Sequence, residues 1–118
     1  KMKRVYTSFE RIETIDVMRD YLATHELPKY IIAATDIIAL GALAAVQEQG
    51  FNVPDDVKIV AFDNSPAAEI VTPALTTVGF DYFVLGQWLY RRLKDLSQAE
   101  PVLHDPMLAG RLVRRTSW

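Results

Sequence analysis

Short apolar runs alternate along this chain with segments of helical periodicity. The runs at residues 30–35 and 58–62 are almost wholly apolar, which is typical of strands that are covered on both faces, as in a parallel sheet. Shorter segments at residues 4–8, 75–78 and 107–115 are predicted to be further strands.

The first helix is predicted over residues 12–22. Thr7 and Glu10 have the spacing of a capping box, so we expect them to start this helix. Its apolar side chains recur at the three- and four-residue spacing of one helix face, at Ile12, Ile15, Met18 and Leu22.

Two more helices are predicted downstream. Residues 37–50 are rich in Ala and Leu and end at Gly50, and Asp36 is the predicted N-cap. The first ten residues of this helix, 37–46, carry no charge, so it is either buried nearly all round or faces a partner. The last helix, residues 83–96, carries a leucine stripe.

The alternation of strands and helices predicts an α/β fold with a Rossmann-like parallel sheet flanked by helices. In open parallel sheets, ligands bind beyond the carboxyl ends of the strands. Three predicted strands end there in polar residues, namely Ser8 beside Phe9, Thr35 and Asp63. We therefore expect these side chains to meet at one edge of the sheet, with Thr35 facing a cleft and Asp36 capping its helix.

Asp63 is the sharpest candidate for a ligand contact. A carboxylate can accept hydrogen bonds from two neighbouring hydroxyls of a polyol. The sequence Asp63-Asn64-Ser65-Pro66 is also good turn chemistry, in which the Asp caps its own turn. Spacing alone leaves both interpretations open.

Three aromatic residues, Phe9, Phe80 and Tyr82, flank the proposed ligand edge. An aromatic face can stack on the apolar face of a sugar through dispersion contacts. Ordinary core packing is an equally open interpretation for each ring.

Composition narrows the function classes. The chain has 118 residues, enough for one compact domain, with 13 Lys and Arg, 15 Asp and Glu, and a net charge of -2. This balance gives no electrostatic footprint for nucleic acid or an anionic membrane. The locally basic tail, with Arg111, Arg114 and Arg115, is interpreted as a solvated strand end. No apolar run approaches the about 20 residues that span a bilayer.

Catalytic and metal chemistry has little support in the sequence. The absence of cysteine excludes disulfides, thiolate catalysis and Cys-ligated zinc, and His25 and His104 lack ligand spacing, so no metal, cofactor or catalytic residue is predicted. One enzyme-like alternative remains, in which Asp36 and Asp63 hold Mg²⁺ or accept a phosphoryl group, as in receiver domains.

Residues 30–78 carry a specific combination of motifs. An acid follows a short strand, then come "ALGAL", a Gly-x-x-Val-Pro-x-Asp-Val loop, a strand ending in Phe-Asp, and Pro-x-Leu-Thr-Thr-Val. This combination closely resembles the effector-binding domain of lactose-repressor-type (LacI/GalR) transcription regulators. The resemblance is fair over residues 82–93 and 111–117 and weaker before residue 29.

The resemblance implies a periplasmic-binding-protein-like (type I) fold, with two Rossmann-like subdomains around a cleft. Residues 1–75 would form most of the C-terminal subdomain, residues 76–110 a hinge crossing and a helix that packs on the N-terminal subdomain, and residues 111–118 a return strand. The DNA-binding headpiece would be absent from this chain. Because the chain begins with Lys1, we also expect it to be a piece of a longer protein with exposed apolar faces.

The resemblance also implies a ligand site, in which Asp63 binds sugar hydroxyls and Phe9 stacks on the effector. Two cleft positions depart from the family pattern. Thr35 replaces the usual Asn, and Phe80 replaces a polar residue that is often Gln. Both changes suggest a less hydroxylated or differently shaped ligand.

The implied function is a cytoplasmic, sugar-responsive transcription regulator that is not an enzyme. Its partners would be a small-molecule effector, operator DNA through the missing headpiece, and a second copy through the helix at residues 37–46, with no membrane. The alternative within this fold is a periplasmic sugar-binding protein of a transporter.

Overall fold

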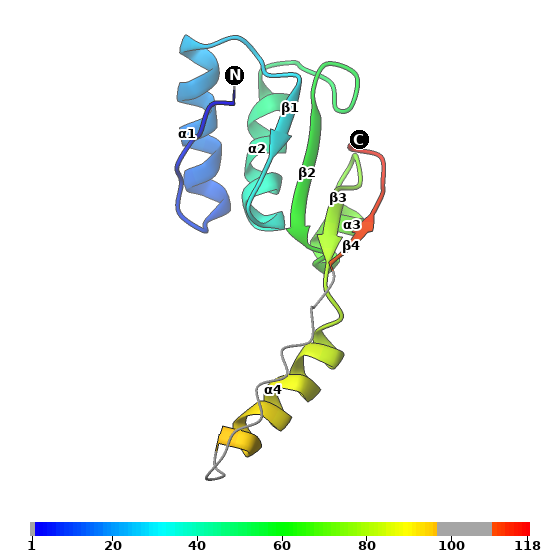
Figure 1. Ribbon diagram of the computed structural model, residues 1–118. Coiled ribbons are helices and arrows are strands. Elements are labelled where there is room, and N and C mark those ends of the chain that lie inside the picture. The colour runs from blue at the N-terminus through cyan, green and yellow to red at the C-terminus, as the bar shows by residue number, and fades with distance from the viewer. Residues whose placement is uncertain (1, 97–109) are drawn as a thin grey trace. The chain divides into compact units, whose positions relative to one another are not determined.

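The computed structural model describes residues 2–96 and 110–118 (Figure 1). Contacts divide the chain into two compact units, Lys1–Gly79 with Leu112–Trp118, and Phe80–Arg111, and each is described by itself. The elements in chain order are α1 (Arg11–Thr24), β1 (Tyr30–Ile32), α2 (Asp36–Glu48), β2 (Lys58–Asp63), α3 (Pro66–Ile70), β3 (Thr76–Gly79), α4 (Tyr82–Leu96) and β4 (Arg111–Val113).

The strands form one sheet in the order β1-β2-β3-β4. Strands β1 and β2 are parallel, as are β2 and β3, with Tyr30 opposite Lys58 and Asp63 opposite Gly79. The predicted α/β fold with a parallel sheet flanked by helices is confirmed, and so are the strands expected at residues 30–35, 58–62 and 75–78.

The core of the first unit lies between the sheet and the helices α2 and α3. It joins Ile59 and Ala61 of β2 to Leu43 of α2, Ala68 of α3 and Leu75. A second cluster joins Met18 of α1 to α2, so α1 packs on α2 rather than directly on the strands (Figure 1).

The apolar strands are well covered on one face, and the described residues cover the other face only in part, where Trp118 lies against Tyr30 (5.6 Å between the ring centroids). Tyr30 and Ile32 are 57% and 69% exposed, which corrects the expectation of coverage on both faces. The strand order gives the reason. Because each right-handed crossover moves one strand further in the same direction, the connecting helices lie on the same face of the sheet.

The segment before α1 differs from its prediction. Residues 2–8 form no strand, and Tyr6 is exposed. Helix α1 begins at Arg11, with Glu10 at the N-cap position and no side-chain cap, so the predicted capping box is wrong. Thr7 instead forms a hydrogen bond with Thr14 inside the helix (3.1 Å between the hydroxyl oxygens).

The second unit contains α4, as predicted from its leucine stripe. Its N-terminus is capped by Asp81, whose carboxylate accepts hydrogen bonds from the amides of Phe83 and Val84 (3.0 Å each). None of the residues of α4 is buried. The strand predicted at residues 107–115 is confirmed at Arg111–Val113, and residues 107–109 lie outside the described residues.

Candidate functional site

The candidate site lies at the carboxyl ends of the parallel strands. Asp63 is the last residue of β2, in register with Gly79 at the end of β3. Figure 1 shows that the starts of α1 and α2 lie at this same end of the sheet. The structure therefore brings the predicted residues of the first unit, Ser8, Phe9, Thr35 and Asp63, to one end of the fold.

The chain turns sharply at Asp63. Asp63 and Asn64 have φ values of 117° and 55°, a region that residues with a side chain rarely adopt and that costs about 1–3 kcal/mol for each residue. Gly79 lets this turn approach β3 closely, since a Cβ atom there would lie 2.6 Å from the Cβ of Asn64.

Hydrogen bonds from elsewhere in the fold hold this strained turn. The amide of Asn64 donates to the Thr77 hydroxyl (3.2 Å), and the Arg115 guanidinium donates to the Asn64 side-chain oxygen (2.8 Å). The amide of Ser65 donates to the Asp36 carboxylate (2.6 Å). These bonds satisfy the turn without requiring Asp63 to bind the amides of Asn64 and Ser65.

Thr35 takes the capping role that was predicted for Asp36, and Asp36 is buried. Thr35 is the N-cap of α2, and its hydroxyl accepts a hydrogen bond from the amide of Ile38 (3.4 Å). Asp36 is 1% exposed and accepts hydrogen bonds from the Thr77 hydroxyl and the Ser65 amide. The prediction that Asp36 caps the helix is therefore wrong, because its carboxylate reaches inward to the end of β3.

Ser8 and Phe9 lie on the segment that leads into α1. Both the amide and the hydroxyl of Ser8 donate to the Glu13 carboxylate, so this segment is tied to the first turn of the helix. Phe9 is 73% exposed. It is not a core residue of the described chain, and its ring face is accessible.

Phe80 and Tyr82 belong to the second unit, where they are 38% and 56% exposed. Their predicted place beside the ligand stays a prediction.

Two residues that the site depends on were not predicted as part of it. Thr77 is fully buried, and the sequence predicts for it an extended segment within the Pro-x-Leu-Thr-Thr-Val motif but no place in the site. Arg115, interpreted as part of a solvated tail, is half-buried and donates to Asn64 and to the Leu75 carbonyl (2.9 Å). The local signal for Thr77 is its position two residues after the apolar Leu75, since residues two apart in an extended segment face the same side.

The structure gives no support to a magnesium site. The Asp36 carboxylate is buried and hydrogen-bonded to protein groups, and no group of three His, Asp or Glu side chains suited to a metal occurs among the described residues. His25 stacks on Tyr21, with ring centroids 4.4 Å apart, while His104 lies outside the described residues.

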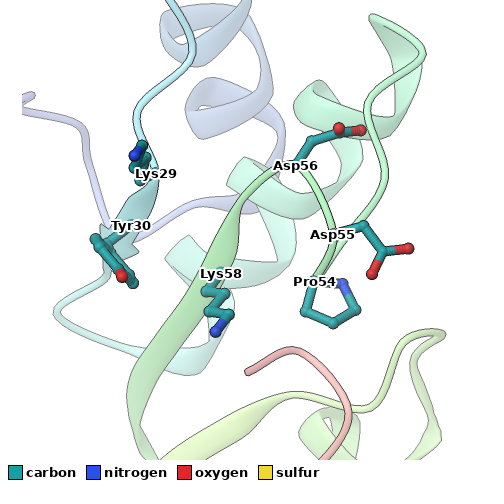
Figure 2. A pocket seen from close by; sticks show the side chains of 6 residues that line it. All are labelled: Lys29, Tyr30, Pro54, Asp55, Asp56 and Lys58. Carbon is teal, nitrogen blue, oxygen red and sulfur yellow. The ribbon is translucent and has the colours of Figure 1, made fainter.

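A shallow hollow of about 200 Å³ lies at the opposite, amino end of β1 and β2 (Figure 2). It is formed by the starts of these two strands and the loop that precedes β2, and it is lined by Lys29, Tyr30, Pro54, Asp55, Asp56 and Lys58. Because it lies at the other end of β2 from Asp63, it is separate from the candidate site.

Comparisons with known proteins agree with this architecture. The profile of the periplasmic binding protein-like domain family matches residues 2–118. The transcriptional repressor PurR of Mannheimia succiniciproducens is 30% identical over 114 residues, which cover 92% of this chain and 34% of that protein. The chain thus spans about a third of the length of this relative.

Solved structures give the same result. The lactose repressor dimer bound to operator and an anti-inducer has a TM-score of 0.84 and 30% identity, with coverage of 92% of this chain and 38% of that one. The complex of the transcriptional regulator CelR with cellobiose has a TM-score of 0.84 and 30% identity, with coverage of 96% and 35%.

The relatives named here are transcriptional regulators and not enzymes, in agreement with the prediction of a non-enzymatic function. Within the described residues, no helix has the length and apolarity needed to cross a bilayer. The chain belongs to the periplasmic-binding-protein-like domain family, in which it matches the C-terminal part of the effector-binding domain of lactose-repressor-type regulators.

Proposed function

We propose that this chain forms the effector-binding and dimerisation region of a sugar-responsive transcription regulator. The observation that carries the proposal is the braced turn at Asp63, which holds a carboxylate at the carboxyl edge of a parallel sheet. A strained geometry that the surrounding structure maintains is typical of ligand-binding positions. The CelR–cellobiose complex, a structural relative, supports a sugar or a sugar derivative as the effector.

In this proposal Asp63 accepts hydrogen bonds from ligand hydroxyls, and the exposed ring of Phe9 stacks on an apolar face of the ligand. The Thr35 hydroxyl and the Ser8 hydroxyl already have partners in the protein, so they offer the ligand only their remaining hydrogen-bonding capacity. Phe80 and Tyr82 would add aromatic surface. A site with few free polar groups and several aromatic rings favours an effector that has fewer hydroxyl groups in need of hydrogen bonds than a free polyol has.

The regulator would act through two relative arrangements of its subdomains. The effector binds one arrangement better, and the resulting change in geometry alters the affinity for operator DNA, which a headpiece outside this chain would contact. Such a protein would work in the cytoplasm. A homodimer would let two headpieces contact two half-sites of the operator.

We place the dimer contact on helix α2, because the resemblance to lactose-repressor-type regulators implies it. The helix carries few charges mainly because its own chain buries eight of its residues. Its remaining apolar surface includes Ile37, which is 41% exposed. The structural relative that is a lactose repressor dimer supports a homodimer as such.

The test is calorimetric titration of the protein, as its gene encodes it, with a panel of mono- and disaccharides that includes lactose and cellobiose. We expect at least one of them to bind, and Asp63→Ala to weaken that binding by about 10- to 100-fold, since hydrogen bonds to a charged group contribute about 1.5–3 kcal/mol. Asp55→Ala, which removes an exposed acid at the other end of the sheet, is the matched control and should leave the affinity unchanged. Equal affinities of the wild type and Asp63→Ala would contradict the proposal.

A further inference from the structure

The buried carboxylate of Asp36 has a hydrogen-bonding role that the proposed effector contacts do not use. It is 1% exposed, and both of its oxygens accept short hydrogen bonds, one from the Thr77 hydroxyl and one from the Ser65 amide (2.6 Å each). The two salt bridges among the described residues are both made by Arg19, so Asp36 is stabilised by these hydrogen bonds and not by a cation within that part of the chain.

Thr77 connects this carboxylate to the turn. Its hydroxyl donates to Asp36 and accepts from the amide of Asn64 (3.2 Å), so both functions of the hydroxyl are used. The Ser65 amide donates to the other oxygen of Asp36. Two successive amides that follow Asp63 are therefore held by one buried pair of side chains.

The held segment is the strained one. Among the described residues, Asp63 and Asn64 are the two non-glycine residues that have positive φ values. Without hydrogen bonds to its amides, such a turn would relax toward ordinary backbone geometry. A relaxed turn would change the direction in which the Asp63 carboxylate points.

We propose that Asp36 and Thr77 are positioning residues of the effector site, which fix the Asp63–Ser65 turn in the geometry that binds the ligand. The expected effect on ligand affinity rests on the proposed function. Whether the two side chains hold the turn can be tested without any ligand. Neither side chain is proposed to touch the effector, because both are at most 1% exposed.

Thr77→Val is the variant that tests this role. Valine has nearly the shape of threonine but can neither donate to Asp36 nor accept from Asn64. Thr77→Ser keeps both hydrogen bonds and should rescue the loss. Asp36→Asn keeps the shape of the carboxylate, but its amide nitrogen cannot accept a hydrogen bond, so one of the two donors loses its partner.

Ser117→Ala provides a matched control for lost stability. The Ser117 hydroxyl is also buried and hydrogen-bonded, to the Ile59 carbonyl (2.7 Å) and the Thr76 amide (2.8 Å). Ile59 lies near the amino end of β2 and Thr76 begins β3, so this variant breaks buried bonds at the end of the sheet away from Asp63.

The first readout is hydrogen exchange by mass spectrometry of the peptide over residues 62–67 in the protein as its gene encodes it. We expect faster exchange in this peptide for Thr77→Val and Asp36→Asn, and exchange at the wild-type rate for Thr77→Ser and Ser117→Ala. If the amides of this peptide exchange no faster in Thr77→Val than in Ser117→Ala, the positioning role is refuted.

The second readout is calorimetric titration with lactose and cellobiose. We expect Thr77→Val to weaken the binding of whichever disaccharide the wild type binds by about ten-fold, and Ser117→Ala to leave it unchanged. If Asp63→Ala weakens binding as proposed and Thr77→Val leaves the affinity unchanged, the positioning role is overturned and the proposed function stays intact. If the wild type binds neither disaccharide and the peptide exchanges faster in Thr77→Val, the effector is not one of these disaccharides. The role of Thr77 in holding the turn is then still supported.

Discussion

Helices α2 and α4 are similar in length but differ in where their apolar side chains lie. Eight of the 13 residues of α2 are buried, between α1 and the sheet, whereas none of the 15 residues of α4 is buried. Helix α2 is apolar nearly all round, and α4 carries its leucines on one stripe. A helix that its own unit buries needs small and apolar residues on every side, while a helix with one apolar stripe needs a single surface to pack on.

The largest effect that separates the two helices should come from truncating a leucine in each. Leu43 of α2 is 1% exposed, and Leu89 of α4 is 46% exposed. Leu43→Ala is expected to lower the free energy of unfolding by about 2–5 kcal/mol, because it removes buried methyl groups and leaves a cavity. Leu89→Ala should change it by less than about 1 kcal/mol in the 118-residue chain. Urea unfolding followed by circular dichroism measures both, and equal losses would contradict the comparison.

The next effect concerns the close contact between α1 and α2. A Cβ atom on Gly41 would lie 2.6 Å from the Cβ of Thr14 and 2.7 Å from the carbonyl oxygen of Arg11. Gly41→Ala is therefore expected to destabilise the chain by about 1–3 kcal/mol through overpacking, although alanine is the better helix former. The same urea unfolding measures the loss. A stabilised Gly41→Ala variant would mean that the two helices can move apart at little cost.

The smallest effect is expected from the matching glycine of α4. A Cβ atom on Gly86 would have no heavy atom within 4 Å. Gly86→Ala should therefore stabilise the helix by up to about 1 kcal/mol, since alanine loses less backbone entropy there than glycine. A rise in helical circular dichroism should accompany this gain in the 118-residue chain. A destabilised variant would show that α4 already packs closely on another surface.

The sequence was sufficient for elements whose pattern is local. The apolar run of β2, the Ala- and Leu-rich α2 and the leucine stripe of α4 were each predicted with nearly correct bounds. The position of Asp63 at a strand end followed from the same pattern. Residues 4–8 had a strand-like composition, yet a strand also needs a neighbour to pair with, which local sequence does not supply.

The contacts of the site could not be predicted, because they join residues that are far apart in the chain. Thr35 and Asp36 are both good N-cap residues, so local preference could not decide between them. The choice depends on Thr77, 41 residues beyond Asp36, whose hydroxyl binds the Asp36 carboxylate. The bond from Arg115 to Asn64 spans 51 residues, and a basic tail gives no sign of it.

In the proposed function, Asp63 holds the ligand at the carboxyl edge of the sheet. A crystal structure of the protein, as its gene encodes it, with a bound sugar from the titration panel tests this most directly. We expect a carboxylate oxygen of Asp63 within about 2.5–3.0 Å of a ligand hydroxyl, which is hydrogen-bonding distance. A ligand bound instead in the hollow beside Lys29 and Lys58, or a ligand that makes no contact with Asp63, would show that Asp63 is not the ligand-binding residue.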